Sequence, residues 1–185
     1  GEYKRVTKDG REIWLNASYN PIFDAEGRPF KVVKFASDVT ALKKRNAEYE
    51  GKVSAIVKAQ AVIEFDMQGN VLDANENFLS VMDYELGDIQ GEHHRMFCEP
   101  EYASSADYKK FWQKLNRGEF DTGRYKRLGS HGKVVWIQAT YNPILDLNGK
   151  PYKVVKFAID ISDQVNMETG IQAKAANDSR KVEAL

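Results

Sequence analysis

Residues 123–162 read GRYKRLGSHGKVVWIQATYNPILDLNGKPYKVVKFAIDIS, and residues 1–40 read GEYKRVTKDGREIWLNASYNPIFDAEGRPFKVVKFASDVT. The two stretches align with Trp14 against Trp136, an offset of 122 residues (136 − 14). About half of the aligned positions are identical, far above chance, and the offset is too long for a solenoid repeat. It matches the length of one small domain plus a linker, so the sequence predicts a duplicated domain.

Each copy reads as three strands joined by short turns. In the first copy we expect strands at 3–6, 12–22 and, in KVVKFA, 31–36, because apolar residues alternate there and β-branched valines are frequent. The turn FDAEGRP carries Asp, Gly and Pro where a hairpin connection needs them, which predicts an antiparallel sheet. Three strands alone have an unpaired edge and an uncovered face. We therefore expect another chain, the second domain or an exchanged element to cover them.

The segment between the copies supplies a front half for the second copy, and nothing before residue 1 corresponds to it. AVIEF and NVLDA flank a turn containing Gly69, which predicts a β-hairpin. Helical turns follow, and then a longer helix in ASSADYKKFWQKLNRG, with Ser104 or Ser105 as its cap and Gly118 as its stop. The predicted organisation is the back half of a first domain (1–40), a linker helix (41–60), a complete domain (61–162) and a helical stub interrupted by Gly170 (163–185).

Several motifs of the second copy are typical of one family. They are D-x-x-G-x-V with A-N-x-x-F between Asp66 and Phe78, F-W-x-x-L-x-x-G-E-F from Phe111, W-I-Q-A-T-Y-N-P-I from Trp136, and a D-[IV]-[ST] triplet that closes both copies. The chain thereby resembles PAS domains, and most of all the PAS pairs ahead of bacterial methyl-accepting chemotaxis transducers. The resemblance implies an α+β fold with a five-stranded antiparallel sheet, short helices on one face and a ligand-sized cavity, preceded by a first PAS domain truncated to its last three strands. It also implies a sensory function.

The aerotaxis-receptor PAS domain, which binds flavin adenine dinucleotide, is similar at a set of residues that would contact a cofactor. The set comprises His94, Met96, Trp112 and Trp136, to which we add Asn75, a residue also suited to capping a short helix. At Cys98-Glu99 the sequence departs from the Arg and His of that family and lacks the positive charge that suits a pyrophosphate. Flavin, haem as the less favoured choice, and no cofactor stay open. For the histidines and aromatic residues the alternative is a plain core role.

The D-[IV]-[ST] triplets, Asp38 to Thr40 and Asp160 to Ser162, each precede a predicted helix. Thr40 and Ser162 suit N-caps whose side-chain oxygens accept from the first-turn amides, and with Asp38 and Asp160 they form a predicted signal relay between sheet and helix. In the linker helix, Leu42, Tyr49 and Ile56 are seven residues apart. This spacing indicates either a homodimer contact or packing on the helix's own sheet. A downstream signalling domain of the same chain is the expected recipient of the signal.

Composition and motifs argue against other classes. Lys+Arg 27 against Asp+Glu 27 lacks the basic excess of a nucleic-acid binder, and the short basic patches at 43–45 and 126–128 suit solvated faces. No catalytic motif and no metal-ligand spacing occurs, so we expect neither an enzyme nor a metal site. The single Cys98 and the lack of a long apolar run favour a cytoplasmic module, whose full-length protein could still be membrane-anchored. The alternative function is a ligand-free PAS interaction module that mediates dimerisation.

Overall fold

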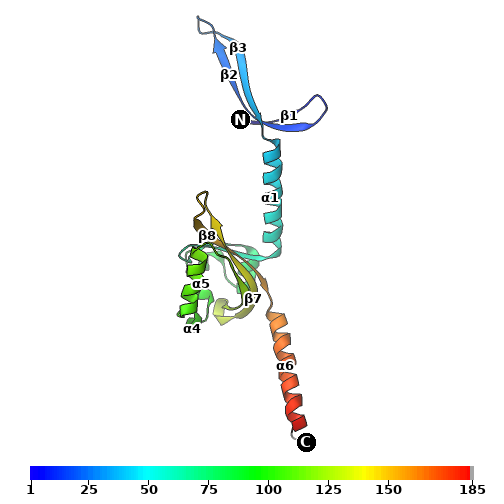
Figure 1. Cartoon of the computed structure of the whole chain (residues 1–185), viewed down its shortest axis with the longest axis vertical. Coiled ribbons are helices and arrows are strands. Elements are labelled where there is room, and N and C mark those ends of the chain that lie inside the picture. Colours follow the sequence, from blue (N-terminus) through cyan, green and yellow to red (C-terminus); the bar gives the residue numbers. More distant parts are fainter. Residues whose placement is uncertain (184–185) are drawn as a thin grey trace. The chain divides into compact units, whose positions relative to one another are not determined.

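The computed structural model describes the backbone of residues 1–183 and the side chains of residues 1–173 (Figure 1). The chain divides into two compact units, Gly1–Ile56 and a second unit that starts at Val57. The boundary between the units falls inside one helix, α1 (Thr40–Ala59). Each unit is therefore described by itself.

The first unit is a three-stranded antiparallel sheet followed by most of α1. Its strands β1 (Glu2–Val6), β2 (Glu12–Phe23) and β3 (Pro29–Asp38) pair in the order β1-β2-β3, which confirms the three strands expected in this copy. Large apolar side chains of β3 remain exposed in the described chain: Phe30 by 65%, Val32 by 61% and Phe35 by 66%. The expectation that something covers this sheet stays a prediction.

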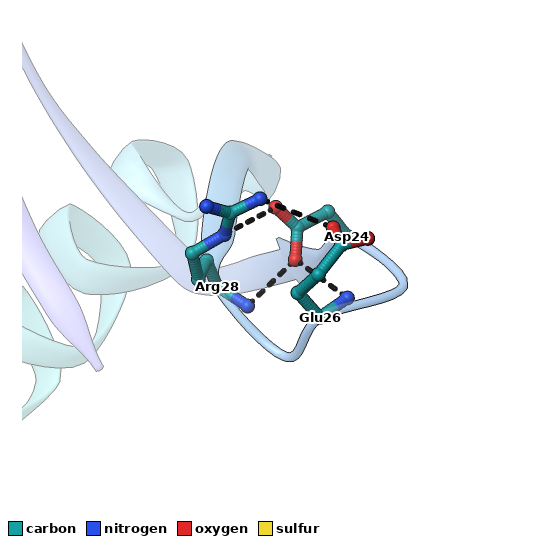
Figure 2. Close-up of polar contacts among 3 residues, drawn as sticks. All are labelled: Asp24, Glu26 and Arg28. Atoms are coloured by element: carbon teal, nitrogen blue, oxygen red, sulfur yellow. Dashed lines mark hydrogen bonds and ion pairs between the residues drawn. The ribbon is translucent and has the colours of Figure 1, made fainter.

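The β2–β3 turn shows why Asp and Gly were needed there. One carboxylate oxygen of Asp24 accepts from the backbone N–H of Glu26 at 3.0 Å and from that of Arg28 at 2.8 Å. The Arg28 side chain donates to the carboxylates of Asp24 and Glu26 (Figure 2). Gly27 supplies the positive φ of +77° that such a turn requires. Asp146 makes the same two backbone bonds in the second copy, with Asn148 and Lys150.

The second unit has a five-stranded antiparallel sheet in the order β5-β4-β8-β7-β6. The strands are β4 (Ala61–Asp66), β5 (Val71–Ala74), β6 (Asp121–Leu128), β7 (Val134–Leu145) and β8 (Pro151–Asp160). Between β5 and β6 lie α2 (Glu76–Met82), α3 (Leu86–Ile89), the 3-10 helix η1 (His94–Phe97), α4 (Pro100–Ala103) and α5 (Ala106–Asn116). A short 3-10 turn, η2 (Ser130–Gly132), connects β6 to β7, and α6 (Ser162–Glu183) follows β8. The predicted α+β architecture is confirmed.

The core of this unit lies between the helices and one face of the sheet, which we call the inner face. The inner face alternates along each strand, as a half-buried strand must. It presents Ile63 and Phe65 from β4, Val135, Ile137, Ala139 and Tyr141 from β7, and Val154 and Ala158 from β8. Helix α5 covers it with Phe111, Trp112 and Leu115, and Ser105 caps that helix as expected.

Helix α6 differs from expectation. It runs through Gly170 without the predicted interruption, because one glycine costs a helix only about 1 kcal/mol. In α1 the stripe of Leu42, Tyr49 and Ile56 is exposed by 44–58%, and none of the residues of this helix is buried. Among the described residues, no helix combines the length and apolar character that crossing a membrane would require.

Candidate functional site

Three polar residues are buried in the described chain, and all three belong to the second unit: His94, Arg127 and Lys156. They come from η1, β6 and β8, which are distant in sequence. Tyr141 of β7 lies among them, and Lys156 is its direct cross-strand partner. The fold thus gathers a polar cluster within an otherwise apolar core.

His94 lies at the centre of an aromatic cage. Its ring nitrogens lie 3.0 Å (Nδ1) and 3.1 Å (Nε2) from the hydroxyls of Tyr108 and Tyr141. It stacks on Tyr108 and meets Phe65 edge-to-face at 5.2 Å between ring centroids. Burial, followed by the nearby cations, holds the pKa of His94 well below its usual range, so the ring is neutral at neutral pH. Both nitrogens have partners, so this geometry is that of a satisfied core histidine.

Arg127 donates from Nη2 to the Tyr141 hydroxyl at 3.2 Å and from Nη1 to the Lys126 carbonyl at 2.9 Å. Its Nε is buried without a partner among the described residues. The expectation of a solvated face at 126–128 was wrong for this residue. Alternate residues of a strand point to opposite faces, and Arg127 falls on the buried one with 2% exposure.

Lys156 is fully buried, and its Nζ also lacks a hydrogen-bond partner among the described residues. The amine lies 5.2 Å from the ring centroid of Tyr141 and 5.4 Å from that of Phe78. Burial first, and then the charge of Arg127, lowers the pKa of Lys156 well below its usual range. The amine therefore gives up its proton more readily than an exposed lysine does.

The hydroxyl of Tyr141 and the thiol of Cys98 complete the cluster. Burial raises the pKa of Tyr141 to about 12, so it stays protonated. The Cys98 sulfur lies 3.8 Å from His94 Nδ1, and burial raises the pKa of this thiol as well. A thiol in this state is a weak nucleophile, so Cys98 has no activated chemistry here.

The structure brings together only some of the residues proposed to contact a cofactor. Trp112 meets His94 edge-to-face at 5.6 Å, and Met96 is half-buried against the same core. Trp136 lies between the inward-facing Val135 and Ile137, so strand alternation places it on the opposite face of the sheet. It is not adjacent to the cluster.

Asn75 braces the start of α2. Its Oδ1 accepts from the backbone N–H of Phe78 at 3.0 Å, which confirms the expected cap, and from that of Val62 at 2.8 Å. Its Nδ2 donates to the carbonyls of Val57 and Gln60 at 2.8 and 2.9 Å. All four hydrogen bonds that an amide side chain can be expected to make are thus used in holding the chain, and none is free for a ligand.

The two D-[IV]-[ST] triplets form the same hydrogen-bond set. In the second unit the Asp160 carboxylate accepts from the Ser162 N–H at 2.8 Å, Ser162 Oγ accepts from the Trp136 N–H at 3.0 Å, and the Ile161 N–H donates to the Trp136 carbonyl at 2.8 Å. The first unit repeats the three bonds. The Asp38 carboxylate accepts from the Thr40 N–H at 2.9 Å, Thr40 Oγ1 accepts from the Trp14 N–H at 2.8 Å, and the Val39 N–H donates to the Trp14 carbonyl at 2.8 Å. Each tryptophan is therefore the anchor of a helix start.

This geometry corrects the predicted N-caps. The helices begin at Thr40 and Ser162 themselves, and the side-chain oxygen of each accepts from the neighbouring strand instead of a first-turn amide. Each hydroxyl therefore ties the start of its helix to the neighbouring strand of the sheet.

The cluster suits some prosthetic groups better than others. Haem needs a free imidazole nitrogen, and His94 uses both nitrogens on tyrosine hydroxyls, so its present arrangement does not fit an axial ligand. The unpartnered donors of Arg127 and Lys156 fit an anionic group. No group of three or more His, Cys, Asp or Glu side chains among the described residues could hold a metal ion.

Sequence reasoning missed Arg127, Lys156 and Tyr141. A signal was present in the repeat: Arg5, Tyr19 and Lys34 occupy the same three positions in the first copy. A charged residue at an inward position of a strand is also unusual in itself.

Comparisons with known proteins place the chain in a family. The family model described as PAS fold matches residues 1–36 and 71–158. Biofilm dispersion protein BdlA of Pseudomonas aeruginosa is 47% identical over 177 residues, which cover 96% of this chain and 42% of that protein. The aerotaxis receptor of Escherichia coli is 30% identical over 80 residues, 43% of this chain and 16% of the receptor. The chain spans less than half of either relative.

Solved structures agree on the fold. A PAS domain from Colwellia psychrerythraea matches with a TM-score of 0.54 at 21% identity, over 62% of this chain and 98% of that one. A light-oxygen-voltage domain studied with a flavin analogue matches with a TM-score of 0.53 at 21% identity, over 71% and 96%. Family model, relatives and fold agree: this chain belongs to the PAS family and is related to proteins of biofilm dispersion and aerotaxis.

Proposed function

We propose that the chain is the sensory module of a chemotaxis-type receptor. In this proposal a small ligand or a redox cofactor state is sensed at the inner face of the five-stranded sheet, and the change passes into α6 through the anchored junction. The supporting observation is the repeated hydrogen-bond set at Trp14 and Trp136, because it ties the last strand, the long central strand and the helix start into one element. The names of two relatives, a biofilm dispersion protein and an aerotaxis receptor, also support a sensory function.

The physical basis of the relay is rigidity. A strand that shifts by about an ångström would carry the Ser162 end of α6 with it, because three hydrogen bonds and no flexible linker connect them. A further ion pair, from Arg124 of β6 to Glu168 at 3.1 Å, fixes the second turn of α6 to the same sheet. The recipient would be a downstream signalling domain of the same protein in the cytoplasm. No reaction is assigned to the chain.

The test places the chain ahead of a methyl-accepting signalling domain and measures the output of the histidine kinase that this domain controls. We expect Asp160→Asn and Ser162→Ala to abolish the response to the stimulus while the protein stays folded, because the junction bonds weaken. Asp146→Asn is the matched control, since Asp146 makes the same kind of backbone bonds at a distant turn. A normal response in both junction variants would contradict the relay.

A second function is favoured by the packed interior. His94 is satisfied and the aromatic residues around it are buried, as expected of a PAS module that binds no ligand and mediates dimerisation. The absorption spectrum of the purified protein and mass spectrometry of co-purifying molecules separate the two functions. A flavin or haem band supports cofactor sensing, and a protein free of any small molecule favours the interaction module.

A further inference from the structure

The inner face holds two buried basic side chains that have no acidic partner among the described residues. Arg127 and Lys156 are at most 2% exposed, and each has a buried nitrogen without a partner among the described residues. None of the buried polar residues in the described part of the chain carries a carboxylate. Burying a cation without an acidic partner costs several kcal/mol, so buried basic side chains are normally paired.

The same constellation is present twice. Tyr3, Arg5, Tyr19 and Lys34 align with Tyr125, Arg127, Tyr141 and Lys156. Two apolar inward positions of the long strand differ between the copies, Ile13 against Val135 and Leu15 against Ile137, and a third, Ala17 against Ala139, is the same, whereas all four of these polar and aromatic residues are identical.

Their geometry is repeated as well. The arginine lies over the first tyrosine ring at 5.0 Å in the first unit and 4.8 Å in the second, and the lysine amine over the second tyrosine ring at 5.3 and 5.2 Å. The two tyrosine rings meet edge-to-face, with centroids 5.9 and 5.5 Å apart. The first-unit residues are exposed and their second-unit counterparts are buried or half-buried, so burial does not create the arrangement.

We propose that the inner face of the second unit is a receptor site for a small organic acid, whose carboxylate binds between Arg127 and Lys156 beside the Tyr141 hydroxyl. The guanidinium of Arg127, the amine of Lys156 and the hydroxyl of Tyr141 supply hydrogen-bond donors for a carboxylate, and a bound carboxylate would favour the protonated amine. The rings of Phe78 and Tyr141 beside the amine suit an organic body attached to it. This inference rests on the proposed sensory function and names the chemical class of its ligand.

The test measures the thermal midpoint of the full chain in formate, acetate or inorganic phosphate against chloride at equal ionic strength. Formate and acetate consist of little besides the carboxylate that the site would bind. We expect them to raise the midpoint by about 2–4 °C at a concentration well above the dissociation constant, and we expect acetamide, the uncharged analogue, to have no effect. No rise with either carboxylate, or an equal rise with acetamide, would overturn the site. A rise with phosphate alone would overturn the assignment to an organic acid.

Variants assign the effect to residues. Lys156→Met should abolish the acetate shift and should also raise the midpoint in chloride, because it removes an unpaired buried amine. The matched control is Lys34→Met, the same change at the aligned exposed position, which should keep the full shift. An acetate shift that survives Lys156→Met would overturn the role of Lys156. Failure of acetate to bind leaves the Asp160 and Ser162 experiment unaffected, so the two proposals are tested separately.

Discussion

Lys156 and His94 show how a single buried position couples the fold to pH. Both are bases whose pKa is lowered by burial, so each binds a proton less tightly in the folded chain than in the unfolded chain. Stability then rises with pH between the folded and the unfolded pKa of each group. The window lies below 10.5 for Lys156 and below 6.5 for His94.

For Lys156 we expect the stability advantage of Lys156→Met over the unmodified chain to shrink as the pH rises toward 10.5. The unmodified chain gains up to about 1.4 kcal/mol per pH unit in this window, and the methionine variant lacks that gain. Urea unfolding of both proteins between neutral pH and the start of the lysine titration measures the difference. A constant difference across the range would show that Lys156 is charged in the folded state.

For His94 we expect the unmodified chain to lose stability faster than His94→Gln as the pH falls below 6.5. The glutamine amide can still bond to the hydroxyls of Tyr108 and Tyr141 but takes up no proton. His94→Phe should cost about 1–3 kcal/mol at neutral pH, because it leaves the Tyr108 hydroxyl without this partner and the Tyr141 hydroxyl with Arg127 alone, and the cost should shrink in acid because phenylalanine takes up no proton. If the unmodified chain and His94→Gln lost stability equally as the pH falls below 6.5, this would argue against a buried neutral histidine.

At the scale of elements, close approaches between backbone segments locate the helices on the sheet. Gly129, in the β6–β7 connection, lies so near the end of α2 that an added Cβ would be 2.4 Å from the Met82 carbonyl oxygen. Backbone cannot move aside as a side-chain end can. This glycine is therefore required by packing and not by its dihedral angles, since its φ of −84° suits any residue.

We expect Gly129→Ala to destabilise the second unit by about 1–3 kcal/mol, with α2 displaced from the connection. Gly87→Ala is the matched control, because nothing lies within 4 Å of its added Cβ, and it should be neutral or slightly stabilising. Chemical unfolding curves for both variants measure the effect. Equal stabilities would show that the connection moves freely.

At the scale of the whole molecule, the exposed stripe of α1 is the surface best suited to a second copy of the chain. Leu42, Tyr49 and Ile56 repeat every seven residues, the spacing that a parallel pair of helices brings together, and Val53 adds a flanking contact with 57% exposure. The partner assignment stays a proposal.

Sedimentation equilibrium tests the proposed homodimer through the α1 stripe. We expect the unmodified chain to self-associate and Tyr49→Glu to shift the equilibrium toward monomer at least several-fold, because it buries a charge in the apolar stripe. Lys44→Glu, on the polar side of the helix, should have little effect. A monomer at all concentrations, or equal weakening by both changes, would contradict a dimer through the stripe.

Most strands, turns and helices of this chain could be predicted from the residue pattern, because alternation, Asp-Gly turns and helix-capping residues act over a few neighbours. The pattern also indicated the helix junctions through the repeated triplet. Three features became visible only in the folded chain: the junction hydroxyls bond to Trp14 and Trp136, Trp136 faces away from the cluster, and Arg127 and Lys156 meet at Tyr141. These contacts join positions far apart in the chain, and their distances depend on the curvature and register of the assembled sheet, which no local pattern encodes.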